Sequence, residues 1–120
     1  MGTNLLIVEL DREIKGLPEE DSLRQQWQVL CESARRYIKL HKEYGESERS
    51  GKVNGQALAQ MGIILTRTHN MFIMNYRNFC QDYSPKMGKP CPLLSQFDFN
   101  NRLEVKRLGE DIVKAFFSEP

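Results

Sequence analysis

The feature that most limits what this chain can fold into is a helical spacing of apolar residues that continues for about thirty residues, from Asn54 or Gly55 to Tyr83. An unbroken helix of that length is a rod of about 45 Å, because each residue adds about 1.5 Å. The alternative is a break near Gly62 or within the polar stretch 66–70. The apolar positions on one broad face are Leu58, Met61, Leu65, Phe72, Phe79 and Tyr83.

Two helices are predicted before this rod. Thr3 or Asn4 can cap the first, and we expect it to end at Gly16 in a left-handed conformation, where the missing Cβ costs least. The second is expected to hold Pro18 in its first turn and to end near Tyr44. Its predicted buried face consists of Leu23, Trp27, Leu30, Ala34, Ile38 and His41.

Two segments rich in glycine or proline flank the rod. Residues 45–55 hold three glycines and are predicted to be a mobile loop, and residues 84–92 hold three prolines and are predicted to lack regular structure. A short helical turn at 93–97 and a last helix capped by Asp98 or Asn100 follow. Because no stretch alternates with a period of two, we expect no strands. The prediction is an all-α single domain over residues 1–120, a bundle of four to five helices with one long central helix.

Composition argues against catalysis and against a membrane protein. There is no phosphate-binding glycine motif, no Glu-x-x-His pair and no C-x-x-C pair, so we expect a non-enzymatic protein with no cofactor, metal or small-molecule substrate. No apolar run approaches the roughly 20 residues that a membrane span needs, and no secretory signal is evident. We therefore expect a cytoplasmic protein. Its three cysteines, Cys31, Cys80 and Cys91, are expected to be free thiols.

The charges are unevenly distributed along the chain. The totals are 17 basic and 16 acidic residues, for a net charge of +1. Residues 1–21 contain six acids and two bases, a net charge of −4, whereas residues 49–107 contain nine bases and three acids, a net charge of +6. A basic segment of this kind favours contact with a polyanion, since each neutralised phosphate releases condensed counterions.

Two rows of polar and basic residues are the candidate nucleic-acid contacts. One follows the second helix, and the other follows the central helix opposite its apolar face, where Met74 and Gln81 also fall. Such rows can contact successive phosphates and sugars without reading bases. The alternative is that each row is an ordinary solvated face. The candidate contact residues are Arg35, Arg36, Lys39 and Lys42 on the second helix, Lys52 in the glycine-rich loop, and Arg67, Asn70, Arg77 and Asn78 on the central helix, with Lys86 and Lys89 as further loop bases.

Methionine and aromatic residues of the central helix have two interpretations. A stripe of this composition is usually core, which is also the favoured reading of Trp27. The central helix is, however, apolar around more of its circumference than one core contact needs. The alternative function is therefore a helical protein-interaction adaptor or regulator that grips a partner helix and makes no contact with nucleic acid.

A small helical chain with these basic rows and no catalytic motif resembles the small subunit of CRISPR RNA-guided effector complexes. The residues that carry the resemblance are Arg35/Arg36/Lys39/Lys42 and Arg67/Asn70/Arg77/Asn78. The resemblance implies a non-catalytic subunit in antiviral defence that stacks with other subunits or with copies of itself. It also implies that the basic residues support the guide–target duplex or the displaced DNA strand. The acidic N-terminal helix would then face a neighbouring subunit.

Overall fold

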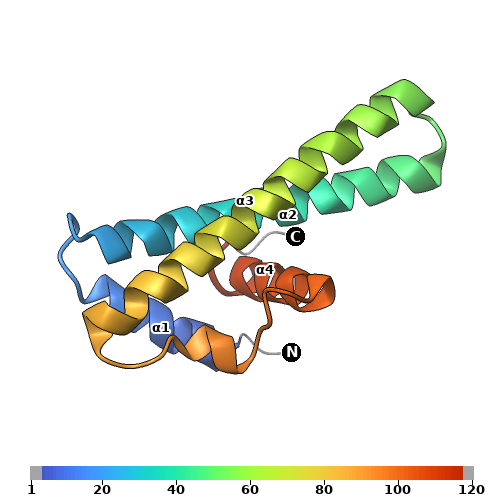
Figure 1. Ribbon diagram of the computed structural model, residues 1–120. Coiled ribbons are helices and arrows are strands. Elements are labelled where there is room, and N and C mark those ends of the chain that lie inside the picture. The colour runs from blue at the N-terminus through green and yellow to red at the C-terminus, as the bar shows by residue number, and fades with distance from the viewer. Residues whose placement is uncertain (1–3, 118–120) are drawn as a thin grey trace.

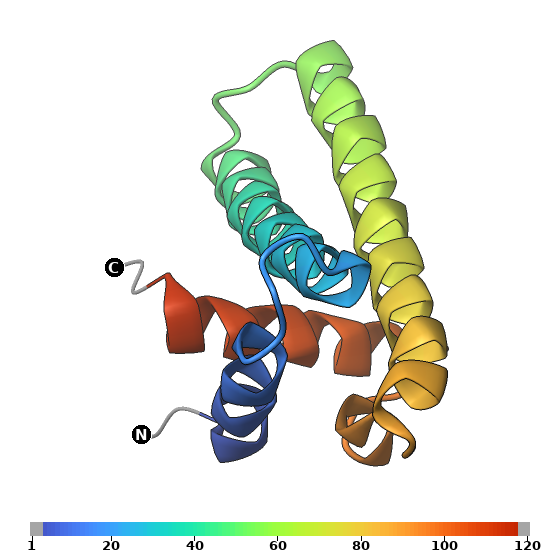
Figure 2. The ribbon, with the colours of Figure 1, turned by 90° about the vertical axis from the view of Figure 1, so that its left-hand side faces the viewer.

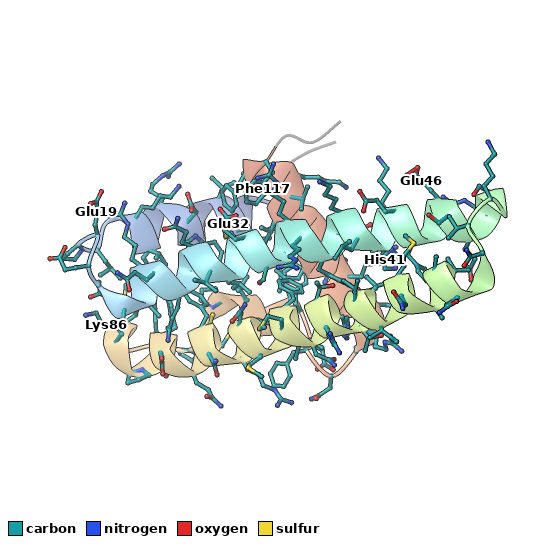
Figure 3. The ribbon with its side chains drawn as sticks, turned by 90° about the horizontal axis from the view of Figure 1, so that it is seen from above. Glu19, Glu32, His41, Glu46, Lys86 and Phe117 are labelled. Atoms are coloured by element: carbon teal, nitrogen blue, oxygen red, sulfur yellow. The ribbon has the colours of Figure 1, made fainter. Side chains whose placement is uncertain are left out.

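The fold is built on a pair of long antiparallel helices. The computed structural model describes residues 4–117, and within them it contains four α-helices, one short 3-10 helix and no strand. Helices α2 (Ser22–Ser50) and α3 (Gly55–Met87) run side by side in opposite directions (Figures 1 and 3). The predicted all-α bundle with a long central helix is confirmed. Helix α3 is unbroken at Gly62 and through residues 66–70.

The shorter elements cover one side of this pair. Helices α1 (Leu5–Lys15) and α4 (Arg102–Phe116), with the 3-10 helix η1 (Pro92–Ser95), lie beneath α2 and α3 in Figure 2. The molecule is elongated, with extents of 50 × 28 × 26 Å. The end of the pair that carries Glu46 and the turn between α2 and α3 projects beyond α1 and α4 (Figures 1 and 3).

The core is centred on aromatic residues of α3. Phe72, Tyr76, Phe79 and Tyr83 follow one another at intervals of four, three and four residues, and all four are fully buried. The predicted face of α2 is confirmed at its centre, because Trp27 packs on Phe79 with ring centroids 5.1 Å apart. By contrast, Leu58, Met61 and Leu65 are only partly buried, since they lie towards the projecting end. Ile38 and His41 of the predicted face are only partly buried. The buried residues of α2 are Leu23, Trp27, Leu30, Cys31, Ala34 and Tyr37.

The predicted loop 45–55 is wrong over most of its length. Helix α2 continues through Gly45 to Ser50 and ends at Gly51, which has a left-handed φ of 67°. One glycine inside a helix costs about 1 kcal/mol, which packing can offset. Here the ring of Tyr44 packs on Gly62 of α3, 3.4 Å from where a Cβ would lie, so the α2–α3 contact reaches the residue next to Gly45. Only residues 51–54 form the turn.

The predicted irregular segment 84–92 is also shorter than expected. Helix α3 includes Pro85 in its last turns and ends at Gly88, whose left-handed backbone donates its N–H to the Ser84 carbonyl at 2.9 Å. Tertiary contacts hold this end: Met87 packs against the core, and Lys86 Nζ lies 2.6 Å from Asp21 Oδ2. These tertiary contacts therefore offset the free-energy cost of a proline within the helix, and they cannot be predicted from the local sequence.

Several predicted helix ends shift by a few residues. Pro18 precedes α2, because the Asp21 carboxylate accepts the Leu23 N–H at 2.9 Å and caps the helix there. Gly16 is right-handed, with φ of −74°, and closes α1 by donating to the Glu13 carbonyl. Asn4 caps α1, and the alternative cap Thr3 lies outside the described residues. Helix α4 is capped by Asn101 instead of Asp98 or Asn100.

Candidate nucleic-acid interface

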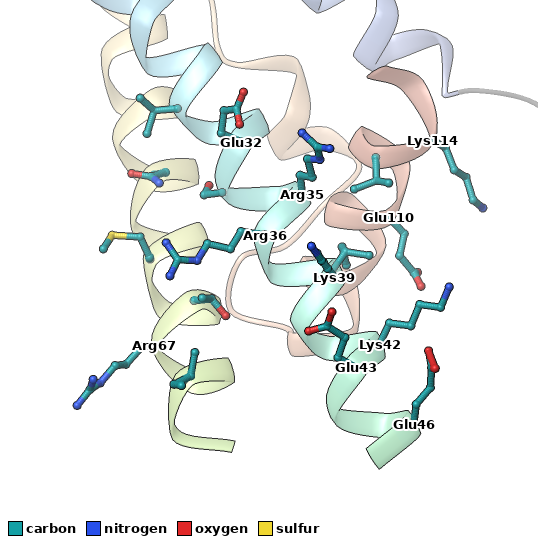
Figure 4. Close-up of a pocket in the computed structure, with 18 residues that line it drawn as sticks. Glu32, Arg35, Arg36, Lys39, Lys42, Glu43, Glu46, Arg67, Glu110 and Lys114 are labelled. Carbon is teal, nitrogen blue, oxygen red and sulfur yellow. The ribbon is translucent and has the colours of Figure 1, made fainter. Parts of the chain in front are cut away.

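Basic side chains gather on the exposed surface of α2 where α4 crosses it. Arg35, Lys39 and Lys42 lie on the side of α2 that faces α4, whereas Arg36 and Arg67 lie on the α3 side (Figure 4). The bases that line this open surface are Arg35, Arg36, Lys39 and Lys42 of α2, Arg67 of α3 and Lys114 of α4. Residues a turn apart on α2 thus present a continuous basic row, as their spacing predicts.

Acidic residues share this surface but leave most of the bases unpaired. The surface is lined by six bases and by four acids, Glu32, Glu43, Glu46 and Glu110. Glu110 already binds Lys106, with 3.8 Å between Oε2 and Nζ. The Arg35 guanidinium lies 5.0 Å from the centre of the Phe117 ring. Across residues 4–117, no carboxylate oxygen lies within 4.0 Å of the charged groups of Arg36, Lys39, Lys42, Arg67 or Lys114.

The remaining candidates lie elsewhere. Asn70, Arg77 and Asn78 are exposed on α3, on the predicted face, but do not line the basic surface on α2. Arg77 lies over the ring of Phe99, 4.8 Å from its centre. Lys52 is exposed in the turn at the projecting end. The structure therefore brings together five of the nine predicted contact residues and leaves four apart.

The acidic N-terminal segment is partly neutralised within the chain. Lys89 Nζ lies 2.9 Å from Glu13 Oε2, and Lys86 pairs with Asp21 as described. Partial burial opposes ionisation of Glu13, but hydrogen bonds from Tyr83 and Lys89 hold its pKa below the ordinary value. Lys86 lies in α3 and not in a loop as predicted, whereas Lys89 does lie outside the helices, and acids 65 and 76 residues away pair with the two lysines.

Lys114 is the basic residue that the sequence did not single out. It lies in the last turn of α4 and is exposed, which is ordinary for a lysine near a helix C-terminus. Only the crossing of α4 over α2 places it on the same open surface as Lys42 and Arg35 (Figure 4). No local signal distinguishes it from other surface lysines.

Three cysteines and one histidine are buried within residues 4–117. Cys31, Cys80 and Cys91 are buried free thiols, and burial raises the pKa of Cys31. Residues 4–117 contain no group of three or more potential metal ligands. His69 is buried, and its Nε2 has no hydrogen-bond partner in the described part of the chain. Its ring packs edge-on against Tyr37, with centroids 5.3 Å apart.

The free energy of unfolding is expected to decrease as the pH falls below about 6.5. Burial lowers the pKa of both His69 and His41, and Arg102 and Lys106 respectively act in the same direction. Below the ordinary histidine pKa the unfolded chain therefore binds protons that the folded chain does not. Each histidine then lowers the free energy of unfolding by at most about 1.4 kcal/mol per pH unit. Urea unfolding between pH 8 and 5.5, followed by Trp27 fluorescence, measures this slope.

Replacing His69 by phenylalanine separates the buried histidine from His41. The His69→Phe variant retains a ring against Tyr37 and removes the unpaired Nε2, so we expect about 1 kcal/mol greater stability at pH 7 and a shallower slope below pH 6.5. His41→Gln is the matched control, because His41 is only partly buried. A slope that His69→Phe leaves unchanged would contradict the assignment.

Comparisons with known proteins identify no relative. No family model, no curated protein and no solved structure matches this chain. No helix within residues 4–117 has the length and apolar character needed to cross a membrane.

Proposed function

We propose that this protein is a non-catalytic helical subunit of a nucleoprotein complex and that it contacts nucleic-acid backbone through the basic surface on α2. The observation that carries the proposal is that Arg35, Lys39 and Lys42 line one open surface together with Lys114, a residue more than seventy positions later in the chain. Arg36 extends the surface towards α3. Placement in a cytoplasmic CRISPR effector complex of antiviral defence is supported by the resemblance in helical architecture and basic rows alone.

The size of the surface sets the strength expected of the contact. Residues 35 to 42 span about 10 Å along α2, the length of about three nucleotides of one B-form strand. Three or four neutralised phosphates make log Kd rise by about 3 for each unit of log salt concentration, and the affinity is too weak for independent function. A weak, electrostatic contact suits a subunit that other components hold against the nucleic acid.

Charge reversal on α2 tests the proposal. Fluorescence anisotropy with labelled single-stranded and duplex DNA at low ionic strength, followed by a salt series, gives affinity and slope. We expect Lys39→Glu combined with Lys42→Glu to weaken binding by at least about tenfold and to reduce the slope by about two, because two phosphate contacts are lost.

Arg12→Glu combined with Arg49→Glu is the matched control. It changes the net charge by the same amount, and both residues are exposed and lie outside the basic surface. Equal weakening by the two double variants would show that only overall charge matters, which contradicts a defined site. Absence of salt-dependent binding by the unaltered chain would overturn the proposed function.

A further inference from the structure

Exposed apolar side chains cluster on α3, beside Arg67 at the α3 edge of the open surface whose α2 bases make the proposed nucleic-acid contact. Ile63, Ile64, Met71 and Met74 are 53%, 45%, 55% and 56% exposed. They are half of the eight large apolar residues that are exposed within residues 4–117, yet they fall within twelve residues of one helix. Single exposed apolar residues are normal, whereas a contiguous group marks an interaction surface.

The helical spacing places these residues along one line. Ile64, Arg67, Met71 and Met74 are separated by three, four and three residues, which is the spacing of a helix–helix contact. Val29 of α2, itself 53% exposed, lines the same surface as Ile64 and Met71. We call the set Ile63, Ile64, Arg67, Met71 and Met74 the α3 seam.

The charge of the seam specifies the chemistry of its partner. Between residues 55 and 81, α3 contains Arg67 and Arg77 and no acidic residue. Arg67 lies in the middle of the apolar line, and no carboxylate in the described part of the chain pairs with it. A phosphate backbone could neutralise Arg67 but would leave Ile64, Met71 and Met74 uncovered. A helix with an apolar stripe and a carboxylate opposite Arg67 satisfies both requirements.

We propose that the α3 seam binds an acidic amphipathic helix of another protein, whose apolar side chains pack on Ile64, Met71 and Met74 while a carboxylate pairs with Arg67. Methionine side chains adapt to a partner of imperfect shape, which suits such a surface. The contact goes beyond the proposed nucleic-acid binding, because it uses residues of α3, whereas Lys39 and Lys42 lie on the side of α2 that faces α4 (Figure 4).

Two synthetic peptides provide the test. Each peptide is about 21 residues long, or three heptads. Leucine occupies the positions that face the α3 seam, and alanine occupies all others except those that flank the leucines. Those flanking positions carry glutamate in one peptide and lysine in the other. Anisotropy of the fluorescein-labelled peptides, titrated with the full chain at physiological ionic strength, should show at least about tenfold tighter binding of the glutamate peptide.

Substitutions in the seam decide the outcome. Arg67→Glu should reverse the preference in favour of the lysine peptide, and Met71→Ser should weaken both complexes. Two controls should leave binding unchanged: Leu103→Ser, at an apolar residue of α4 that is 78% exposed, and Lys39→Glu with Lys42→Glu, which tests nucleic-acid binding separately. A preference that Arg67→Glu does not alter would overturn the proposal. Self-association of the chain that Met71→Ser abolishes would overturn it in favour of a second copy as the occupant.

Discussion

Replacing Phe72 by alanine is expected to lower the free energy of unfolding by about 3–5 kcal/mol. Phe72 is completely buried where α2, α3 and α4 meet: its ring stacks on Tyr37 with centroids 5.8 Å apart, and its edge lies 3.5 Å from the position of a Cβ on Gly109. Truncation therefore leaves a cavity lined by all three helices. Urea unfolding monitored by Trp27 fluorescence and by circular dichroism at 222 nm measures the loss.

The neighbouring residue supplies the control for this substitution. Met71 precedes Phe72 on the same helix but is more than half exposed, so Met71→Ala should change stability by about 0.5 kcal/mol or less. Should Phe72→Ala prevent folding altogether, Phe72→Leu provides a milder test with an expected loss of about 1.5 kcal/mol. A Phe72→Ala variant as stable as Met71→Ala would show that the three helices do not pack around this ring.

Much of this core could be predicted because burial on a helix is a local pattern. The intervals that join Phe72, Phe79 and Tyr83 fix one face of α3, and Trp27 falls on the corresponding face of α2. The methionines show the limit of that pattern. Met71 and Met74 have the same composition as a core stripe, but they are exposed because α2 and α4 cover only the aromatic side of α3.

The errors in helix length arise where tertiary contacts override local preference. Gly45 and Pro85 each disfavour a helix, yet both lie inside one, since Tyr44 packs on Gly62 and Lys86 pairs with Asp21. The same pairing between residues far apart in the sequence explains why the net charge of residues 49–107 overestimates the charge of the basic surface.

For the candidate site, the row on α2 could be predicted from its spacing along one helix. That Lys114 lines the same surface as this row could not be predicted, because its position depends on the angle at which α4 crosses α2. Sequence spacing relates residues within a helix, whereas crossing geometry is set by side chains from several helices at once.

That crossing depends on one glycine, and replacing it by leucine is expected to destabilise the fold by about 2–3 kcal/mol. A Cβ on Gly109 of α4 would lie 3.0 Å from Ile38 Cδ1, 3.1 Å from Ile38 Cγ1 and 3.5 Å from Phe72 Cε2. Leucine has a higher helix propensity than glycine by about 1 kcal/mol, so any loss of stability must come from packing. Urea unfolding of Gly109→Leu measures it.

A matched glycine and a double-mutant cycle identify the cause. Gly45→Leu makes the same change inside α2, where the three atoms nearest to the new Cβ all belong to the side chain of Arg49, which can move aside. Its expected effect is a gain of up to about 1 kcal/mol, opposite in sign to that of Gly109→Leu. Ile38→Ala removes the two atoms nearest to the new Cβ, so Gly109→Leu should cost at least about 1 kcal/mol less in the Ile38→Ala background. If the two changes are additive, the close approach of α4 to α2 at Gly109 does not determine how these helices pack.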